Sequence, residues 1–379
     1  MRKVLGIFSL ALAAGVAGAP AALAGPPPPS GALYGCDFNG DGKADIASNG
    51  ATSIRIQLLD GNTVTSTGFV SNGSGAFTLA GCGDLNGDGN DDLVLNGNNN
   101  TRVNLMNGTA STSQGFVSNG ANVFLVTSVA DVNGDGNADL IASGVGNTQA
   151  RVTLMNGTAT AGQGFVTNAG KTGSFPVTLA ADLNGDGNAD IVGAGATNVR
   201  ISLMNGTTVS SSGFLSNGAG AFTLGGNGAG DVNGDGNSDL IFSGATNTRV
   251  NLMNGTASTG QGFVSNGAGA FPFTMAADLN GDGNADLLSD GATNVRIQLV
   301  TVSAGPVITV TTGFLSNGAG AFDLAAASDS SADGNDDLKF NGATQTRLNL
   351  MNGTVSTAQG FASNGAGAFP VPNLPNLPN

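Results

Sequence analysis

The chain has 379 residues, a formal net charge of −14, and no histidine, tryptophan or glutamate, so all 26 acidic residues are Asp. This surplus of negative charge argues against a nucleic-acid partner, because a phosphate-binding surface needs an excess of basic residues. The absence of His and Glu removes two common general acids and bases, so we do not expect an enzyme.

The N-terminus has the pattern of a secretory signal peptide over residues 1–24. Arg2 and Lys3 precede an apolar, alanine-rich run over 4–14, and Ala22-Leu23-Ala24 matches the A-x-A cleavage pattern. A membrane anchor is the alternative, but the apolar run is short and is interrupted by glycines and Pro20. We therefore expect a secreted or extracellular protein with bacterial-type export, in the periplasm or at the cell surface, and no membrane span.

A proline-rich linker over 25–30 leads into an internal repeat over 31–370, and a proline-rich tail follows over 371–379. Each repeat contains a nine-residue loop, which reads DFNGDGKAD in its first copy. The loops start at Asp37, Asp84, Asp131, Asp182, Asp231, Asp278 and Asp329, which are 47 to 51 residues apart. Repeats of this length share one continuous architecture, so they override the usual relation between chain length and domain number.

Each repeat is predicted to contain four short strands. A small apolar run precedes the loop, as over 76–82, and another follows it, as over 138–144. A third run alternates, as over 54–58, and leads through an Asn-Gly turn into a fourth run that ends in GFVSNGAGAF or a close variant. No segment of the mature chain has a convincing helical period.

Four strands per repeat at this spacing predict an all-β fold, a seven-bladed β-propeller with four antiparallel strands per blade. A solenoid is the alternative, but neither end of the array has the polar capping unit that an open solenoid needs.

Cys36 and Cys82 lie just before the first and second loops. On equivalent strands their side chains would point to opposite faces, which oppose each other in neighbouring blades. We predict a disulfide between blades one and two, as expected in an oxidising compartment. Two unpaired core thiols, or a lipoprotein signal at Cys36, are the alternatives.

The loop has the residue types of an oxygen-ligated calcium site. Asp at positions one, five and nine, an amide at three and the position-seven carbonyl are hard ligands, and glycine at four and six permits the tight turn. These three Asp positions hold 21 of the 26 Asp residues. The predicted ligands are Asp37, Asn39, Asp41, Lys43 and Asp45; Asp84, Asn86, Asp88, Asn90 and Asp92; Asp131, Asn133, Asp135, Asn137 and Asp139; Asp182, Asn184, Asp186, Asn188 and Asp190; Asp231, Asn233, Asp235, Asn237 and Asp239; Asp278, Asn280, Asp282, Asn284 and Asp286; and Asp329, Ser331, Asp333, Asn335 and Asp337.

We expect about one Ca²⁺ per blade, up to seven, with weaker occupancy at loop seven, which has lost the Asn at position three and the Gly at position four. An EF-hand is a poor alternative, because no Glu stands at position twelve of any loop. Mg²⁺ is less suited, since it seldom uses all-protein cages. Metal-free Asp, Asn and Gly turns remain the other interpretation.

The D-x-N-G-D-G-x-x-D loop between short strands, together with the GF and GAGAF segments, resembles the FG-GAP or VCBS repeat over nearly all of 31–370. That repeat builds the seven-bladed propellers of integrin alpha subunits and of a group of fungal lectins. The resemblance implies a calcium loop between the first two strands of each blade, and adhesion, glycan recognition or partner binding. It does not identify the ligand.

Two further residue types recur once per repeat. One is an Arg in the third run: Arg55, Arg102, Arg151, Arg200, Arg249, Arg296 and Arg347. We interpret it as a structural Arg paired with a loop carboxylate or a strand-end carbonyl, and a ring of sites for an anionic glycan is the alternative. The other is the Phe of the GF segment: Phe69, Phe116, Phe165, Phe214, Phe263, Phe314 and Phe361. We expect these Phe residues in the core, and sugar sites between blades are the alternative.

These observations predict an exported, calcium-binding propeller that binds a glycan or a cell-surface protein without catalysis, with calcium mainly structural. The alternatives are a calcium-dependent polysaccharide lyase or hydrolase and a purely structural surface protein.

Overall fold

The computed structural model describes residues 32–120, 123–144, 149–167, 169–170, 173–267, 269–303, 307–365 and 369. The predicted signal peptide, the linker and the tail lie outside these residues, so they stay predictions. The regular structure of the described residues consists of β-strands, without a helix. No transmembrane helix was found in the same part of the chain.

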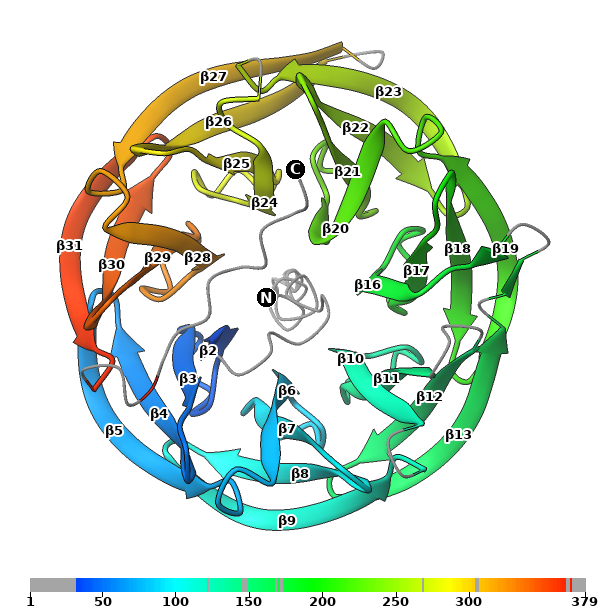
Figure 1. Cartoon of the computed structure of the whole chain (residues 1–379), viewed down its shortest axis with the longest axis vertical. Helices are drawn as coiled ribbons and strands as arrows, with labels where there is room; N and C mark the ends of the chain where they lie inside the picture. The colour runs from blue at the N-terminus through cyan, green and yellow to red at the C-terminus, as the bar shows by residue number, and fades with distance from the viewer. Residues whose placement is uncertain are drawn as a thin grey trace, which may run out of the picture.

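Seven four-stranded antiparallel sheets stand in a ring, as Figure 1 shows. This arrangement confirms the predicted seven-bladed propeller. Within each sheet the strands lie side by side in chain order. The first strand of each blade faces the centre of the ring, and the fourth strand forms its perimeter.

Blade one consists of β2 (Ala32–Cys36), β3 (Asp45–Asn49), β4 (Ser53–Asp60) and β5 (Thr63–Ser71). Blade two consists of β6 (Phe77–Gly83), β7 (Asp92–Gly97), β8 (Asn100–Asn107) and β9 (Ala110–Ser118). Blade three consists of β10 (Phe124–Ala130), β11 (Asp139–Gly144), β12 (Gln149–Asn156) and β13 (Ala159–Thr167). A two-stranded hairpin follows, made of β14 (Ala169–Gly170) and β15 (Gly173–Ser174).

Blade four consists of β16 (Val177–Ala181), β17 (Asp190–Ala194), β18 (Asn198–Asn205) and β19 (Thr208–Ser216). Blade five consists of β20 (Phe222–Gly230), β21 (Asp239–Gly244), β22 (Asn247–Asn254) and β23 (Ala257–Ser265). Blade six consists of β24 (Phe273–Ala277), β25 (Asp286–Asp290), β26 (Asn294–Ser303) and β27 (Val307–Ser316). Blade seven consists of β28 (Phe322–Ser328), β29 (Asp337–Gly342), β30 (Gln345–Asn352) and β31 (Val355–Ser363).

The third strand of each blade is buried on both of its faces. In β4, Ile54 and Ile56 are inaccessible to solvent, and the intervening Arg55 is 5% exposed. Alternation of apolar and polar residues ordinarily predicts one solvated face. Here both faces are covered, because each blade packs between two others. The apolar clusters accordingly combine residues of neighbouring blades, as Ile56 of blade one does with Leu95 of blade two.

The ring is closed by residues from both ends of the array. The first strands of blades one and seven, β2 and β28, contact each other. Phe369, from the last GAGAF segment, lies in blade one with its ring centroid 5.7 Å from that of Phe69. In blade two the corresponding partner of Phe116 is Phe77, which begins that blade's own first strand. The seventh repeat therefore supplies the phenylalanine that completes the first blade.

Candidate metal centre

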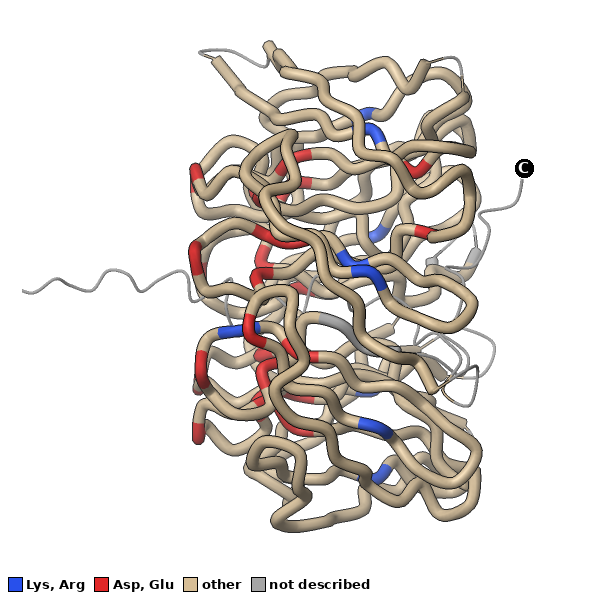
Figure 2. Tube along the Cα trace, turned by 90° about the vertical axis from the view of Figure 1, so that its left-hand side faces the viewer, with Lys and Arg blue, Asp and Glu red and all other residues tan. Residues whose placement is uncertain are grey.

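Each predicted loop joins the first and second strands of its blade. The seven loops place most of the Asp residues toward one face of the ring, which Figure 2 shows edge-on. Most Lys and Arg residues lie away from this face. The acidity of the chain is therefore concentrated at the loops, as the sequence predicted.

The Asp at position one organises the loop backbone. In loop two, Asp84 Oδ1 accepts hydrogen bonds from Asn86 N at 3.1 Å and Gly87 N at 2.7 Å, and Oδ2 accepts one from Gly89 N at 2.8 Å. Gly87 and Gly89 have φ angles of 73° and 87°, a left-handed region in which glycine is unstrained. The glycines at positions four and six therefore let the loop curl around one carboxylate.

Positions three and five contact each other through their side chains. Asn86 Nδ2 donates to Asp88 Oδ2 at 2.9 Å, and Asp88 Oδ1 accepts from Asn90 N at 2.9 Å. In loops one and four the position-three oxygens, Asn39 Oδ1 and Asn184 Oδ1, are buried without a hydrogen-bond partner. A buried oxygen without a donor is unfavourable and is suited to a cation.

The Asp at position nine is buried in every loop and clamps the loop to the third strand. Asp45 Oδ2 accepts from Phe38 N at 3.0 Å, and Oδ1 accepts from Leu59 N at 2.8 Å, where the ladder between β4 and β5 shifts register. The sequence motif predicted a metal ligand here. The structure adds a role in holding the backbone, which no local pattern indicated.

Burial raises the pKa of the position-nine carboxyl to about 7 in loops one to six, that is, in Asp45, Asp92, Asp139, Asp190, Asp239 and Asp286. The hydrogen bonds from backbone N–H groups lower the pKa and only partly oppose the effect of burial. A divalent cation would favour the ionised form of these carboxyls.

The donor set fits a hard cation, although not as a cluster of carboxylates alone. Among the described residues, no three Asp or Cys side chains lie together in a way that would hold a metal ion. The groups that could serve are the position-one and position-five carboxylates, which also accept hydrogen bonds within the loop, the position-three side-chain oxygen and the position-seven carbonyl. These are ligands that Ca²⁺ accepts. The position-seven side chain of loop one, Lys43, turns to Asp60 at 2.7 Å instead.

The loops also join neighbouring blades. Asp91 N donates to the carbonyl of Asp37 at 2.6 Å, and Gly108 N in the Asn-Gly turn of blade two donates to the carbonyl of Phe38 at 2.7 Å. The contact at position eight recurs at all seven junctions, including the closing one, where Ala44 N donates to Asp329 O at 2.7 Å. A loop stiffened by a metal would therefore brace the junction with the next blade.

Two carboxylates at position eight were missed by the sequence analysis. Asp91 is buried, and its Oδ2 accepts from Asp37 N at 2.9 Å; Asp336 accepts from Asp278 N at 3.0 Å in the same way. Burial raises the pKa of Asp91 well above its usual value and that of Asp336 to about 7. The signal for them was the Asp itself, since the other five loops have Ala or Ser at position eight.

Loop seven differs in its backbone as well as in its side chains. Ala332 replaces the glycine at position four and has a φ angle of 58°, which is strained for a residue with a Cβ. Asp329 still accepts from Ala332 N at 2.7 Å and Gly334 N at 2.9 Å. The loop therefore keeps its shape, and weaker metal occupancy stays a prediction.

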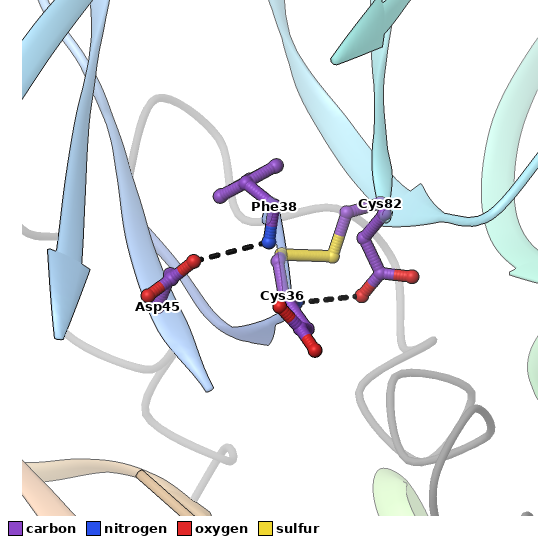
Figure 3. Close-up of a disulfide and its surroundings, with 6 residues drawn as sticks. Cys36, Phe38, Asp45 and Cys82 are labelled. Atoms are coloured by element: carbon purple, nitrogen blue, oxygen red, sulfur yellow. Dashed lines mark hydrogen bonds between the residues drawn. A yellow bond between two sulfur atoms is a disulfide. The ribbon is translucent and has the colours of Figure 1, made fainter. Parts of the chain in front are cut away.

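Cys36 and Cys82 form the predicted disulfide (Figure 3). Their Cα atoms are 6.1 Å apart, and they join β2 of blade one to β6 of blade two. Both cysteines belong to the apolar cluster of that junction, and Cys36 lies one residue before Asp37. The covalent link therefore lies beside the first loop.

Four of the seven arginines, Arg102, Arg249, Arg296 and Arg347, connect blades through strand-end carbonyls, in agreement with the structural interpretation. Arg102 donates from Nη2 to the carbonyl of Ser71 at 2.5 Å, and Arg249 donates to the carbonyl of Ser216 at 2.9 Å. The guanidinium carbon of Arg102 also lies 4.7 Å from the ring centroid of Phe77. Each such Arg reaches from its own blade to the outer strand of the blade before it.

The expectation that the GF phenylalanines are core residues was wrong. These residues, which we name the rim phenylalanines, are 51–60% exposed: Phe69, Phe116, Phe165, Phe214, Phe263, Phe314 and Phe361. They lie on the perimeter strands, where no further sheet layer covers them. Their apolar character suggested burial, but the core of each blade is filled by the third strand and the strands next to it.

Comparisons with known proteins agree with this architecture. A family model described as the FG-GAP-like repeat matches residues 37–95, 84–142, 182–242 and 231–289. No curated protein sequence matches the chain.

Solved structures similar to the chain include the WD40 domain of SCAP from fission yeast, at 10% identity and a TM-score of 0.49, covering 89% of this chain and 88% of that one. Another is the Tc holotoxin pore of Photorhabdus luminescens, at 15% identity and a TM-score of 0.45, covering 85% of this chain. The chain spans 16% of the length of that holotoxin chain.

Proposed function

The chain belongs to the FG-GAP-like repeat family, and from this premise we propose that it is an exported, calcium-stabilised binding module. It recognises a glycan or a cell-surface protein and catalyses no reaction. The propeller fold is that of a binding or structural module. The observation that carries the calcium proposal is the sevenfold loop, whose oxygen ligands lie where neighbouring blades are joined.

In each loop the ion would be held by the carboxylates at positions one and five, the oxygen at position three and the carbonyl at position seven. Ca²⁺ would offset the charge of these carboxylates and of the buried Asp at position nine. The unpartnered oxygens of Asn39 and Asn184 support this assignment. Since the metal would brace inter-blade contacts, its role is structural, and binding free energy becomes folding free energy.

Thermal unfolding in calcium, in magnesium and in chelator tests the metal. We expect the midpoint to fall strongly in chelator and to return with calcium more than with magnesium. Titration calorimetry should give up to seven sites, the weakest being loop seven. Asp88→Asn, which removes one charge from an exposed ligand of loop two, should remove one site, whereas Asp60→Asn, outside the loops, should remove none. A midpoint unchanged by chelator contradicts the proposal.

The binding role is tested by an array of glycans and of extracellular proteins in calcium buffer. We expect hits on the array and no release of reducing or unsaturated ends from a polysaccharide panel. Product release would favour the alternative of a calcium-dependent lyase or hydrolase. An array without any hit would favour a purely structural surface protein.

Export is proposed from the signal pattern over 1–24 and from the disulfide, which suits an oxidising compartment. Expression of the full chain in a bacterial host should yield a mature protein that begins at Gly25 outside the cytoplasm. N-terminal sequencing of the exported form checks this, and retention of Met1 in the exported form contradicts it.

A further inference from the structure

The rim phenylalanines are large apolar side chains that are exposed once in every blade. Each lies on a perimeter strand, and each is more than half exposed, from 51% at Phe361 to 60% at Phe69. Single exposed apolar side chains are ordinary on protein surfaces, but a set repeated in every blade is not. A sevenfold array of exposed aromatic rings is therefore a candidate binding surface.

The rings are held in place from one side only. Each rim phenylalanine packs against a second Phe ring of its blade, which is buried in the case of Phe175 and partly buried in the others, with centroids 5.4–6.2 Å apart and planes tilted by 42–55°. In blade two the second ring is Phe77, which itself lies against the guanidinium of Arg102. The exposed ring is therefore anchored rather than loose, which lowers the entropic cost of binding through it.

The rings lie at the end of the blade opposite to the loops. Gly108, in the turn at the start of β9, contacts loop one, whereas Phe116 lies near the other end of the same strand, opposite Arg102 in the ladder. A ligand on the rings would therefore not compete with a metal in the loops.

The perimeter strands that carry the rings are uncharged, and the nearest exposed charge by contact is Asp323, which follows Phe322, the ring that packs on Phe361. None of the seven perimeter strands contains Asp, Lys or Arg, and their exposed positions are mostly Ser, Thr and Gln, as in ASTSQGFVS of β9. Six of the seven arginines beneath the rings are buried, Arg200 is half-buried, and four of the buried ones donate to a backbone carbonyl, as Arg249 does to that of Ser216. The perimeter strands themselves thus offer no charged group to an anionic or a cationic ligand.

From this chemistry we infer that the rim phenylalanines are seven equivalent sites for a neutral polysaccharide. The apolar face of a sugar ring packs on the exposed aromatic ring, and the neighbouring hydroxyl and amide side chains hydrogen-bond the sugar hydroxyls. A polymer of repeated sugars can occupy several blades at once, so weak single sites add to a strong total affinity. This inference rests on the proposed binding role and specifies its site and ligand class.

Other occupants fit the surface less well. An anionic membrane or an acidic polysaccharide requires exposed basic residues, which the perimeter strands lack, and the formal charge of −14 repels both. A second copy of the chain would bring hydroxyl-rich edge strands together without any charge to set their register. These occupants are outcomes of the experiment below.

The experiment is affinity electrophoresis of the full chain in calcium buffer, in gels containing hydroxyethyl cellulose, mannan, a mixed-linkage glucan or, as the anionic comparison, alginate. We expect retardation by at least one neutral polymer and none by alginate. Phe116→Ala alone should weaken binding only a few-fold. Replacement of all seven rim phenylalanines should weaken it at least about 100-fold, the scale of lost multivalency.

The matched control removes other exposed apolar side chains from the perimeter strands, through Val209→Thr, Val307→Thr and Val355→Thr, which should leave retardation unchanged. Unchanged thermal midpoints establish that each variant is folded. If the sevenfold variant does not fold, variants with one, two and three substitutions replace it, and the affinity must fall stepwise with their number.

Retardation that persists in the variants overturns this inference and leaves the binding role intact. If the wild-type protein binds nothing on the glycan and protein array, the proposed binding function itself is contradicted. Phe-dependent binding to phosphatidylcholine vesicles, or Phe-dependent dimers in analytical ultracentrifugation, without retardation by any neutral polymer, also overturns the inference. In those cases the rings serve a membrane or a second copy of the chain.

Discussion

The junction between blades one and two differs from the junction that closes the ring between blades seven and one. The first is joined by the Cys36–Cys82 disulfide and by an apolar cluster that includes Phe38 and Leu95. At the second, blades seven and one meet without a disulfide, and a buried lysine, Lys339, takes the place that Val94 has in blade two.

Lys339 lies among acidic groups at the closing junction. Its Nζ donates to the carbonyl of Ser328 at 2.7 Å and to its hydroxyl at 2.5 Å. Burial lowers the pKa of Lys339 to about 8, while the carboxylates of Asp337 and Asp336, and more weakly those of Asp329 and Asp45, oppose this shift. Loop seven therefore has a lysine ammonium group close to its carboxylates. It is also the loop that differs most from the repeated motif.

The comparison teaches that identical repeats need not be joined identically. Interior junctions can rely on repeated contacts, because both partners are whole repeats. The closing junction is formed by the two ends of the array and has contacts of its own. These are made by Lys339 in blade seven and by Phe369, which packs in blade one. Variants of the disulfide, Lys339 and Phe369 measure how much each contributes to the free energy of unfolding.

The largest effect is expected from pH in the metal-free protein. The position-nine carboxyls of loops one to six have a pKa of about 7 in the folded chain against an ordinary value of 3.8, so the folded chain binds more protons. Their contribution to stability is full below pH 3.8 and is lost as the pH rises through about 7. One pKa unit in one carboxyl corresponds to about 1.4 kcal/mol, and six loops contribute.

Urea unfolding in chelator should accordingly give a higher midpoint at pH 5 than at pH 7.5. Added calcium should reduce this difference, since a bound cation favours the ionised carboxyl. If the midpoint instead increases with pH in chelator, burial does not raise the pKa of these carboxyls in the folded protein.

Removal of the disulfide should be the next largest effect. The bridge spans 46 residues, and in the chain-entropy model a loop of this length contributes about 4 kcal/mol. The double variant Cys36→Ala, Cys82→Ala should lose this amount in chemical denaturation. If it loses less than about 1 kcal/mol, interior contacts alone hold this junction and the contrast with the closing junction disappears.

Lys339→Met removes the buried cation and leaves the carboxylates of Asp336 and Asp337 without it. Loss of one partner of a buried charge cluster costs about 3 kcal/mol. Leu288→Met, at the equivalent position in blade six, changes shape but not charge and should cost less than about 1.5 kcal/mol. Equal unfolding free energies of the two variants at pH 7 would mean that Lys339 does not compensate the acidic groups.

Phe369→Ala removes the ring that the last repeat contributes to blade one. The ring lies 4.5 Å from the guanidinium carbon of Arg55 and is partly buried, so we expect a loss of about 2 kcal/mol. Phe222→Ala makes the same change within blade five and is the matched control. Limited proteolysis should cut the Phe369 variant first near blades one and seven; cleavage in the same order as the Phe222 variant argues against a closing role.

The smallest effect is expected at position four of loop seven. Ala332→Gly relieves a left-handed backbone conformation and should stabilise the protein by about 1 kcal/mol. Ala189→Gly, at position eight of loop four and without a left-handed φ angle, should not stabilise it. A thermal midpoint that does not increase for Ala332→Gly means that loop seven adopts another backbone conformation in solution.

The sequence alone determined the architecture of this protein. The loop recurs seven times at a near-constant spacing, and its flanking runs alternate in the manner of short strands, so blade number and strand order follow from local pattern. The disulfide was also predictable, because two cysteines at nearly equivalent positions of consecutive repeats face each other once blades stand side by side.

Only the tertiary structure decided what the repeated side chains do. The partner of Arg102, the exposure of Phe116, the clamp formed by Asp45 and the environment of Lys339 all depend on a neighbouring blade or on a strand distant along the chain. Local periodicity predicts which residues recur. It does not predict which of them are exposed to solvent, hydrogen-bonded to a carbonyl or close to a charged group. The physical reason is that burial and hydrogen-bond partners are set by the packing of one repeat against the next, and the repeat pattern is nearly the same on both sides of every junction.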